Sequence, residues 1–378
     1  MSQIRSRLAV FAFLPFVVIS PAPALAQKAT PAYTFTDLGG LPNPNSVTSE
    51  ARAVNDSGQV VGLSYVARPS GTVSHPVVWA KDATGKYVIT DLGTLGGNSG
   101  KALGINSQGE IVGIAQGTDT GIYAFLIHPL TVNGSKVWYQ DLNLDGINDL
   151  MTNLGVAVDD SENKGISDNT QIAAGVNLVQ FDGAGDEVVT TLPRNGVGCA
   201  INDNRQVAGY VDGAVAPLQP AIWQVDAAGN AVSVITLSPL PGNTDGEALC
   251  INALGQAAGA SSYVSGNLAY PRATLWQSGA TPTDLGSLAT QSTSEALGIN
   301  TVNGVLQVVG SVDILNRGER AFVWKNGVMT DLNTLISVSG VALSRAYAIN
   351  AQGQIAGFAL VTVGKKNTEL HGYLLTPK

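Results

Sequence analysis

One nine-residue segment carries side chains of the kind that bind a hard cation: DLNLDGIND, residues 141 to 149. Oxygen-bearing side chains occupy its first, third, fifth and ninth positions, and a glycine at the sixth permits a sharp turn. Calcium is bound by oxygens in this alternating pattern, together with a backbone carbonyl at the seventh position. The pattern therefore predicts a structural calcium site formed by Asp141, Asn143, Asp145, the Ile147 carbonyl and Asp149.

This segment resembles the calcium loops of integrin-type propellers and of thrombospondin and dockerin repeats. Thr152 stands at the twelfth position, where an EF-hand has a glutamate, so a complete EF-hand is disfavoured. The alternative is a solvated turn rich in Asn and Asp that caps the ends of strands. Bound calcium would stiffen the protein here rather than take part in a reaction.

No set of residues predicts a catalytic centre or an organic cofactor. His75, His128 and His371 lack zinc-ligand spacing with cysteines or carboxylates, so we expect them to be structural. No nucleophile elbow, P-loop or dinucleotide fingerprint occurs in a strand-to-helix context. The aspartates that recur at one repeat position are expected to serve turns: Asp91, Asp284 and Asp331.

The elements that must position these residues come from a repeat. Its unit is a small residue, an aliphatic residue, Asn, a turn, a polar residue, two small or aliphatic residues and Gly, as in AVNDSGQVVG at 53–62. The Asn position occurs seven times: Asn55, Asn106, Ser167, Asn202, Asn252, Asn300 and Asn350. The intervals are 51, 61, 35, 50, 48 and 50 residues, so the third copy is out of phase and the fourth recovers.

Each copy predicts four short strands. The aliphatic-Asn pair ends the first strand, and Asn and Gly form the turn. The second strand is small and aliphatic, as in residues 59–62, and we expect its small residues, the glycine among them, to let a neighbouring sheet approach closely. A third run ends in a large residue such as Trp79 or Trp223, which should pack within the blades, and a fourth contains Thr-Asp-Leu. Four strands in about 50 residues is typical of a propeller blade.

The sequence therefore predicts an all-β protein: a β-propeller of seven four-stranded blades, forming a single repeat-built domain over residues 27–378. We expect the third blade to be irregular, and a six-bladed ring or an open solenoid remains an alternative. A lone fourth-type run, residues 36–39, opens the mature chain, and a third-type run ends it. The N-terminal strand is thus expected to close the last blade and remove an exposed edge.

The repeats resemble those of the HAF-repeat extracellular proteins of bacteria over nearly the whole mature chain. Those repeats read Asp-Leu-Gly, Ala-x-Gly-Ile-Asn, a Gly-x-Val-Val-Gly strand, His-Ala-Phe and then Trp. The best matches here are residues 90–97, 102–113, 320–324 and 329–333. The naming triplet is altered to His75-Pro76-Val77, Tyr123-Ala124-Phe125 and His371-Gly372-Tyr373. The resemblance implies export and a repeat architecture, and the family carries no assigned reaction.

Residues 1–26 are typical of a secretory signal peptide. Arg5 and Arg7 precede an apolar run at 8–19, and Ala24-Leu25-Ala26 forms a small-x-small cleavage site before Gln27. An uncleaved membrane anchor is the alternative, but the run is short for a span. No later segment is long and apolar enough to cross a bilayer. We expect a secreted or periplasmic bacterial protein.

Charge and cysteine content narrow the class of partner. The formal net charge of −8 becomes −10 when Arg5 and Arg7 are removed, and no basic stripe with interleaved aromatics occurs, so a nucleic-acid partner is excluded.

Cys199 and Cys250 lie in neighbouring repeats but one residue out of register, which on strands turns side chains to opposite faces. A disulfide and two buried thiols both remain open.

These features favour a protein without catalytic activity: an exported binding or interaction scaffold whose partner is an extracellular or periplasmic protein or glycan. The alternative is a propeller-type hydrolase or lyase acting on an extracellular polysaccharide or other polymer, which requires acids and a base that converge on the ring axis. A purely structural surface protein is the third possibility. An axial pocket without clustered carboxylates, histidine or arginine would remove the enzyme alternative.

Overall fold

The computed structural model describes residues 32–42, 47–68, 71–158, 164–213, 216–265, 268–364 and 367–378. The chain divides into two units, Met1–Thr30 and Pro31–Lys378. The signal peptide expected over residues 1–26 lies outside the described residues. All of the described residues belong to the second unit.

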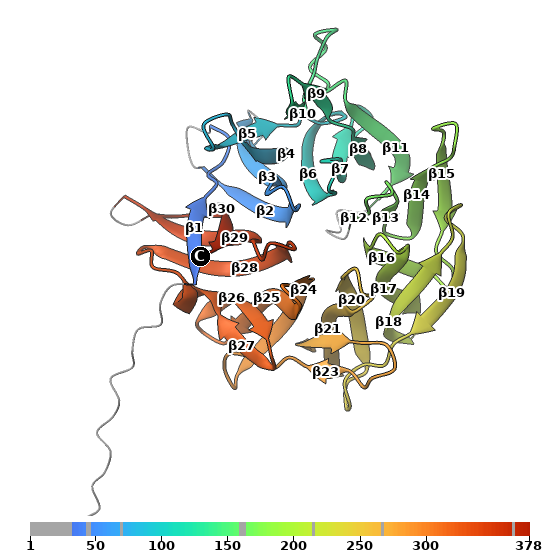
Figure 1. Ribbon diagram of the computed structural model, residues 1–378, viewed down its shortest axis with the longest axis vertical. Helices are drawn as coiled ribbons and strands as arrows, with labels where there is room; N and C mark the ends of the chain where they lie inside the picture. The colour runs from blue at the N-terminus through green and yellow to red at the C-terminus, as the bar shows by residue number, and fades with distance from the viewer. Residues whose placement is uncertain are drawn as a thin grey trace, which may run out of the picture. The chain divides into compact units, whose positions relative to one another are not determined.

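The second unit is a β-propeller of seven four-stranded antiparallel blades around a central axis (Figure 1). Each innermost strand contacts the next one around the ring, and the last, β28, contacts the first, β2, so the ring is closed. Seven blades are thus confirmed, and the six-bladed and open alternatives are wrong.

The four strands of each blade follow one another from the axis outward. Blades 1 to 4 consist of β2 (Ser49–Val54), β3 (Val60–Arg68), β4 (Gly71–Lys81) and β5 (Tyr87–Asp91); β6 (Gly96–Ile105), β7 (Ile111–Gly117), β8 (Ile122–Ile127) and β11 (Met151–Ala157); β12 (Lys164–Ile166), β13 (Ile172–Ala174), β14 (Asn177–Phe181) and β15 (Glu187–Thr191); and β16 (Gly196–Ile201), β17 (Gln206–Gly213), β18 (Ala216–Val225) and β19 (Ala231–Thr236). Blades 5 to 7 consist of β20 (Asp245–Ile251), β21 (Ala257–Ser265), β22 (Leu268–Trp276) and β23 (Thr283–Asp284); β24 (Ser292–Val302), β25 (Val305–Ile314), β26 (Gly318–Lys325) and β27 (Val328–Asp331); and β28 (Val341–Ile349), β29 (Ile355–Val363), β30 (Asn367–Pro377) and β1 (Tyr33–Asp37). A hairpin of β9 (Leu130–Val132) and β10 (Ser135–Val137) and a 3-10 helix, η1 (Leu332–Leu335), lie outside these sheets.

The N-terminal strand closes the last blade, as predicted. Strand β1 pairs with β30 from Tyr33 opposite Pro377 to Asp37 opposite Tyr373. The outer edge of β30 is therefore covered by a strand from the other end of the described chain. The third blade is also irregular as expected, because its two inner strands, β12 and β13, have only three residues each.

The repeat Asn joins each turn to the next blade. The Asn55 Oδ1 atom accepts the backbone N–H of Gln59, which closes the turn after β2. Its amide nitrogen donates to the Asn106 carbonyl of blade 2 at 2.9 Å. Equivalent bonds cross four other blade interfaces: Asn106 to Ser167, Asn202 to Asn252, Asn300 to Ile349 and Asn350 to Asn55. One side chain thus shapes the inner hairpin and ties neighbouring blades together.

A β-bulge interrupts six of the seven innermost strands at the same repeat position. The extra residue is the third before the Asn: Arg52, Leu103, Cys199, Leu249, Leu297 and Tyr347. In β12, described from Lys164 onward, the pairing with β13 has no register shift. A bulge twists and bends the strand that carries it.

The bulge explains the glycine that ends the repeat. A Cβ atom built on Gly259 would lie 2.0 Å from the Glu247 carbonyl oxygen, and one on Gly62 1.9 Å from that of Glu50. In both cases the obstructing backbone belongs to the bulged strand of the same blade. The expectation that this glycine admits a neighbouring sheet is therefore wrong. Where the bulge is absent, in blade 3, Ala174 takes the place of the glycine.

Apolar residues fill the interfaces between blades. Seven clusters of buried side chains each draw on two neighbouring blades, one cluster for each interface. Trp79 and Trp223 are fully buried in two of them, and Trp276 is nearly so in a third. The recurrent tryptophans are thus packing residues, as the repeat predicted.

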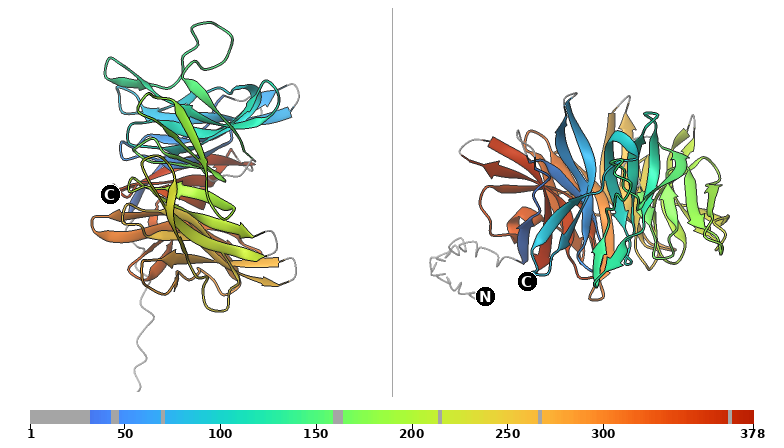
Figure 2. Two further views of the ribbon diagram at one scale, coloured as in Figure 1. Left: turned by 90° about the vertical axis from the view of Figure 1, so that its right-hand side faces the viewer. Right: turned by 90° about the horizontal axis from the view of Figure 1, so that it is seen from above.

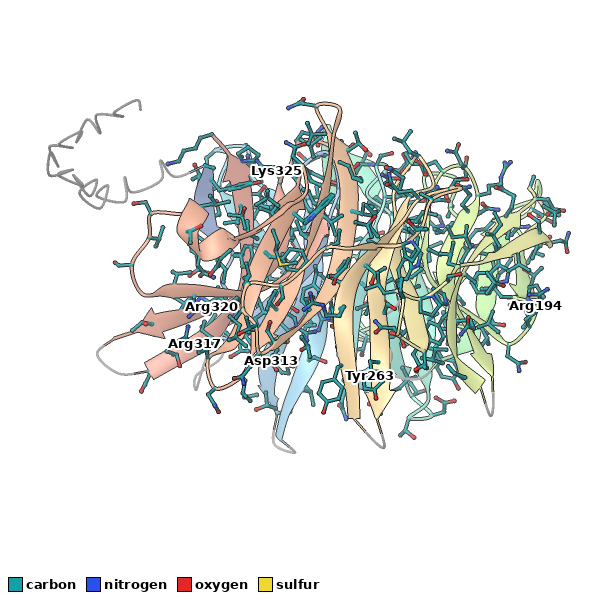
Figure 3. All side chains as sticks on the ribbon, turned by 90° about the horizontal axis from the view of Figure 1, so that it is seen from below. Arg194, Tyr263, Asp313, Arg317, Arg320 and Lys325 are labelled. Atoms are coloured by element: carbon teal, nitrogen blue, oxygen red, sulfur yellow. The ribbon has the colours of Figure 1, made fainter. Side chains whose placement is uncertain are left out.

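The strands run between two faces of the ring (Figure 2). One face carries the tips of the hairpins between second and third strands, where Tyr263 lies, and we name it the hairpin face (Figure 3). The other carries the Asn turns and the turn after β26, where Lys325 lies, and we name it the Asn face (Figure 3). Each innermost strand therefore runs from the hairpin face toward the Asn face.

The recurrent aspartates of the fourth strands organise turns, as expected. Asp37, Asp91, Asp284 and Asp331 each accept the backbone N–H of the residue two positions later. Three of them also face a basic residue of the third strand: His371 for Asp37, His75 for Asp91 and Arg272 for Asp284. His75 and His371 are thus structural, because they connect the third strand to the outermost one.

The stability of the contact between β1 and β30 depends on pH through Asp37 and His371. The hydrogen bond that His371 donates to Asp37 raises the pKa of His371, and burial opposes this shift. Burial acts to raise the pKa of Asp37, but the hydrogen bonds from His371 and Gly39 together lower it. His371 therefore stabilises the fold below its unfolded-state pKa of about 6.5, and Asp37 does so above about 3.9.

Asn350→Ala should lower the free energy of unfolding by about 1 kcal/mol more than Asn252→Ala does. This difference is the usual net contribution of one hydrogen bond to stability. Both amides hold their own turn, but within the described residues only the Asn350 amide also reaches the next blade. Chemical denaturation followed by tryptophan fluorescence measures both losses. Equal losses would show that the bond between blades contributes nothing.

The stability difference between the wild type and His371→Gln should be largest between about pH 4 and pH 6.5. It should shrink as the pH rises through the elevated pKa of His371, and also as the pH falls through the lowered pKa of Asp37. Urea unfolding at a series of pH values measures it. A difference independent of pH would rule out the ion pair as a stabilising contact, and Asp37→Asn should abolish most of the dependence.

Candidate functional site

A cavity of about 470 Å³ lies on the ring axis, lined by the innermost strands of all seven blades. Its wall includes the bulged residue of all six interrupted strands. Because a bulge re-aims a side chain, these residues are released from the packing between blades. They differ from blade to blade, whereas the alanine or glycine that precedes them in the chain is nearly invariant.

The wall of the cavity is layered along the axis. Isoleucines that directly precede the Asn position form an apolar layer at the Asn face: Ile105, Ile166, Ile201, Ile251, Ile299 and Ile349. Charged residues stand four positions earlier in the strands, toward the hairpin face: Glu247, Glu295 and Arg345. At a rise of about 3.3 Å per residue, the two layers are roughly 10 Å or more apart.

The charged lining comes from one side of the ring. Blades 5 and 6 supply Glu247 and Glu295, blade 7 supplies Arg345 and Tyr347, and blade 1 supplies Arg52. Within the described residues, blades 2, 3 and 4 contribute only small or aliphatic residues and one cysteine to the wall. The site thus breaks the symmetry of the scaffold that forms it.

Both arginines of the cavity are neutralised by glutamates outside it. Arg52 forms an ion pair with Glu50 at 2.7 Å, and its guanidinium lies over the Tyr347 ring, 4.2 Å from the centroid. Arg345 forms an ion pair with Glu319, also at 2.7 Å. Each pair joins neighbouring residues or blades, so the two cations are committed to fixed partners.

The two glutamates of the cavity are not neutralised in this way. Neither Glu247 nor Glu295 forms a hydrogen bond or a salt bridge with any residue that the structure describes. Burial raises the pKa of Glu247, and the negative charges of Glu295 and Asp245 add to the shift. These carboxylates are therefore the polar groups of the cavity that a bound molecule can engage.

Cys199 and Cys250 both line the axial cavity. Cys199 is the bulged residue of β16, whereas Cys250 directly follows the bulged residue of β20 and packs between blades 5 and 6. The two residues, both in the described part of the chain, form no disulfide. Burial raises the pKa of the Cys250 thiol to about 12, so it is a poor nucleophile.

A second cavity, of about 670 Å³, lies between blades 4 and 5 near the outer strands. Its lining is largely apolar and includes Pro239, Pro241, Leu254, Trp276 and Pro282, without a charged side chain. It follows from the shortness of β23, which has two residues where other outer strands have four to seven. The axial cavity is the better candidate because all seven blades line it and its wall carries charged side chains.

The segment predicted to bind calcium lies between the β9–β10 hairpin and β11, far along the chain from the axial residues. Asp141 accepts the backbone N–H groups of Asp145 and Gly146, and Asp149 accepts that of Leu142. Leu142 and Leu144 point into solvent, with 76% and 86% of their surfaces exposed. The alternating pattern thus directs oxygens to one side of the loop and leucines to the other.

The remaining predicted ligands also lie within this loop. Asn143 donates to Asp145 at 3.0 Å, and Asp145 accepts the N–H of Ile147. The oxygen types suit calcium, but in the part of the chain that the structure describes no three His, Cys, Asp or Glu side chains are grouped to hold a metal. Calcium binding by Asp141, Asn143, Asp145, Ile147 and Asp149 stays a prediction.

Asn148, which the sequence did not single out, anchors this loop. It is almost fully buried, and its amide donates to the carbonyls of Leu92 and Trp138. Its Oδ1 accepts the N–H groups of Gln140 and Leu150. Since Leu92 belongs to the segment that follows β5, this one side chain fastens the insertion to blade 1.

The sequence also did not single out the charged residues of the axial cavity. Glu247, Glu295 and Arg345 share one position in the repeat, five residues before the Asn, where Glu50 also stands. Comparing the copies at that position would have revealed the group. Their role was hidden because a charged residue within a strand resembles a residue on its exposed face.

Among the described residues, no helix is long and apolar enough to span a membrane. No protein-family model matches the chain, and no curated protein matches its sequence.

Several solved structures share the propeller fold. The chain is similar to the acylaminoacyl peptidase of Pyrococcus horikoshii (9% identity, TM-score 0.44, covering 85% of this chain and 50% of that one). It is also similar to a lectin of Burkholderia pseudomallei (12% identity, TM-score 0.42, covering 90% of this chain and 99% of that one). A third similar structure is the PQQ-bound aldose sugar dehydrogenase of Streptomyces coelicolor (10% identity, TM-score 0.39, covering 92% of this chain and 100% of that one). The chain spans half the length of the peptidase that it matches. At these identities the likeness concerns the fold alone.

Isothermal titration of the protein with calcium should release or absorb heat that Asp145→Ala removes. Asp145 is a suitable position because its carboxylate has no contact outside the loop among the described residues. Asp182→Ala is the matched control, since Asp182 also shapes an exposed turn through its Oδ1 atom but lacks the alternating oxygens. Identical heats for the wild type and Asp145→Ala would end the calcium interpretation.

Proposed function

We propose that this chain is an exported binding protein that holds a small polar ligand in its axial cavity, with the seven blades as the scaffold. The cavity volume, about 470 Å³, lies within the range of small-molecule sites. A natural source of such a ligand is a fragment of an extracellular or periplasmic protein or glycan. The expected signal peptide at 1–26 and the likeness to HAF-repeat proteins support export. The calcium loop, if it binds its ion, stiffens the blade 2 insertion.

The observation that carries this proposal is the one-sided charge of the cavity wall. A residue required by the ring itself recurs in the copies of the repeat, as the Asn and the glycine do. Charged residues recur in the same way five positions before the Asn, as Glu50, Lys101, Glu247, Glu295 and Arg345. Of these, Glu247, Glu295 and Arg345 line the cavity, on three consecutive blades, and the two glutamates form no hydrogen bond or salt bridge among the described residues. Partly buried carboxylates without a partner lower stability, so their presence favours a role in binding.

The carboxylates also favour a second candidate, a hydrolase or lyase acting on an extracellular polymer. The raised pKa of Glu247 is the property of a general acid, and Glu295 is close enough to contribute to it. A pair of this kind, with one proton held and one released, is used to cleave glycosidic bonds. Chain shortening of a polysaccharide by the wild type, lost in Glu247→Gln, would establish this activity in place of simple binding.

The binding proposal is tested by filling the cavity. Leu249 lines the cavity as a bulged and only partly buried residue, so Leu249→Trp adds bulk there without disturbing the contacts between blades. In a thermal-shift screen of sugars, amines, organic acids and short peptides, at least one class should stabilise the wild type and not this variant. At a ligand concentration of 100 times Kd the stabilisation is about 2.7 kcal/mol.

Two further variants show in which cavity the stabilising ligand binds. Leu315→Trp, on an exposed hairpin tip, should respond as the wild type does. Leu254→Trp, in the wall of the second cavity, should also do so. A ligand lost only in Leu254→Trp would place binding between blades 4 and 5, and a screen in which Leu249→Trp matches the wild type for every class would overturn the proposal.

A further inference from the structure

The layered wall of the axial cavity specifies the chemical character of its ligand. Toward the Asn face, six isoleucines from six blades present an apolar surface. Toward the hairpin face, two carboxylates on adjacent strands, Glu247 on β20 and Glu295 on β24, present negative charge. A ligand that satisfies both layers has a polar head and an apolar body.

The ion pairs around the cavity determine which sign of charge the head group of the ligand should carry. Arg52 and Arg345 are each paired with a glutamate outside the cavity, Glu50 and Glu319, and Arg345 also interacts electrostatically with Glu295. Glu50, Glu319, Glu247 and Glu295 together outnumber the two arginines, so these side chains carry a net negative charge. Lys101, at the equivalent position of blade 2, does not line the cavity. The charges that face the ligand are therefore those of Glu247 and Glu295, and an anionic head group would be repelled by both.

We propose that the axial cavity binds a primary amine on an apolar chain, with the ammonium group between Glu247 and Glu295 and the chain along the isoleucine layer. This inference rests on the proposed function, since it names the ligand class of the same cavity. An ammonium ion donates three hydrogen bonds and has no acceptor, which suits a site that offers two carboxylates. Contact with the isoleucines removes the apolar chain from water.

Other ligand classes fit this wall less well. A free sugar would leave the isoleucine layer in contact with hydroxyl groups that find no hydrogen-bond partners there. A fatty acid would fill the apolar layer but place its carboxylate beside two others. A neutral alcohol fits both layers without repulsion, but it lacks the charge-assisted hydrogen bonds of the amine. The comparison of amine, alcohol and acid therefore isolates the head group.

The test is isothermal titration of the purified protein with hexylammonium chloride, hexan-1-ol and sodium hexanoate. Hexylammonium should bind about tenfold or more tightly than hexanol, the usual effect of a hydrogen bond to a charged group, and hexanoate should bind most weakly. In the double variant Glu247→Gln, Glu295→Gln, the affinity for hexylammonium should fall to that for hexanol, while hexanol binding stays unchanged. Unchanged hexanol binding shows that the variant is folded.

The matched control is Glu187→Gln, which removes one negative charge from an exposed position on the outermost strand β15. It should leave the preference for the amine intact, and a loss equal to that of the double variant would mean that the total charge of the protein attracts the amine. Equal affinity of the wild type for hexylammonium and hexanol would overturn the inference while leaving a binding cavity. No binding of any probe by the wild type would overturn it too, and the Leu249→Trp screen decides separately whether the cavity binds another class.

Discussion

One side-chain amide, repeated at the end of the innermost strands, is the contact on which the ring depends. Its oxygen closes the turn of its own blade, and its nitrogen donates to the backbone of the next blade. Asparagine is suited to both tasks because it carries an acceptor and a donor on one short side chain. In blade 3, where Ser167 replaces it, the serine hydroxyl still accepts the turn N–H of Gln171, and the two inner strands are the shortest of any blade.

The bulge beside this amide separates the scaffold from the site. Residues on either side of it pair with the second strand, and the carbonyl groups of the bulged strand leave no room for a Cβ on the repeat glycine. The extra residue takes no part in that pairing and lines the axial cavity. The bulged position therefore accepts Arg52, Leu249 or Tyr347 without a change in the blade. The ring thus keeps a nearly seven-fold backbone while the side chains of the cavity wall vary from blade to blade, and among the described residues the charged ones come from blades 5, 6, 7 and 1.

The sequence was informative wherever a feature recurred. The period predicted the number of blades, the lone Thr-Asp-Leu run predicted the closure of β1 on β30, and the recurrence of the tryptophans predicted that they are packing residues. It was misleading where one residue was inserted into a strand. A bulge exchanges the two faces of a strand beyond it, and no periodicity in the letters reveals this. For that reason the repeat glycine was assigned to the wrong neighbour.

Closure by β1 and β30 has a consequence for how the chain reaches its final form. Asp37 and His371 meet although 334 residues separate them in the chain. The seventh sheet therefore cannot be completed until β30 has emerged, whether from the ribosome or from an export channel. Until then β1 has unpaired backbone groups that another chain could pair with. The ring thus assembles late, and any partner that shields the first strand before release would also protect the protein from self-association.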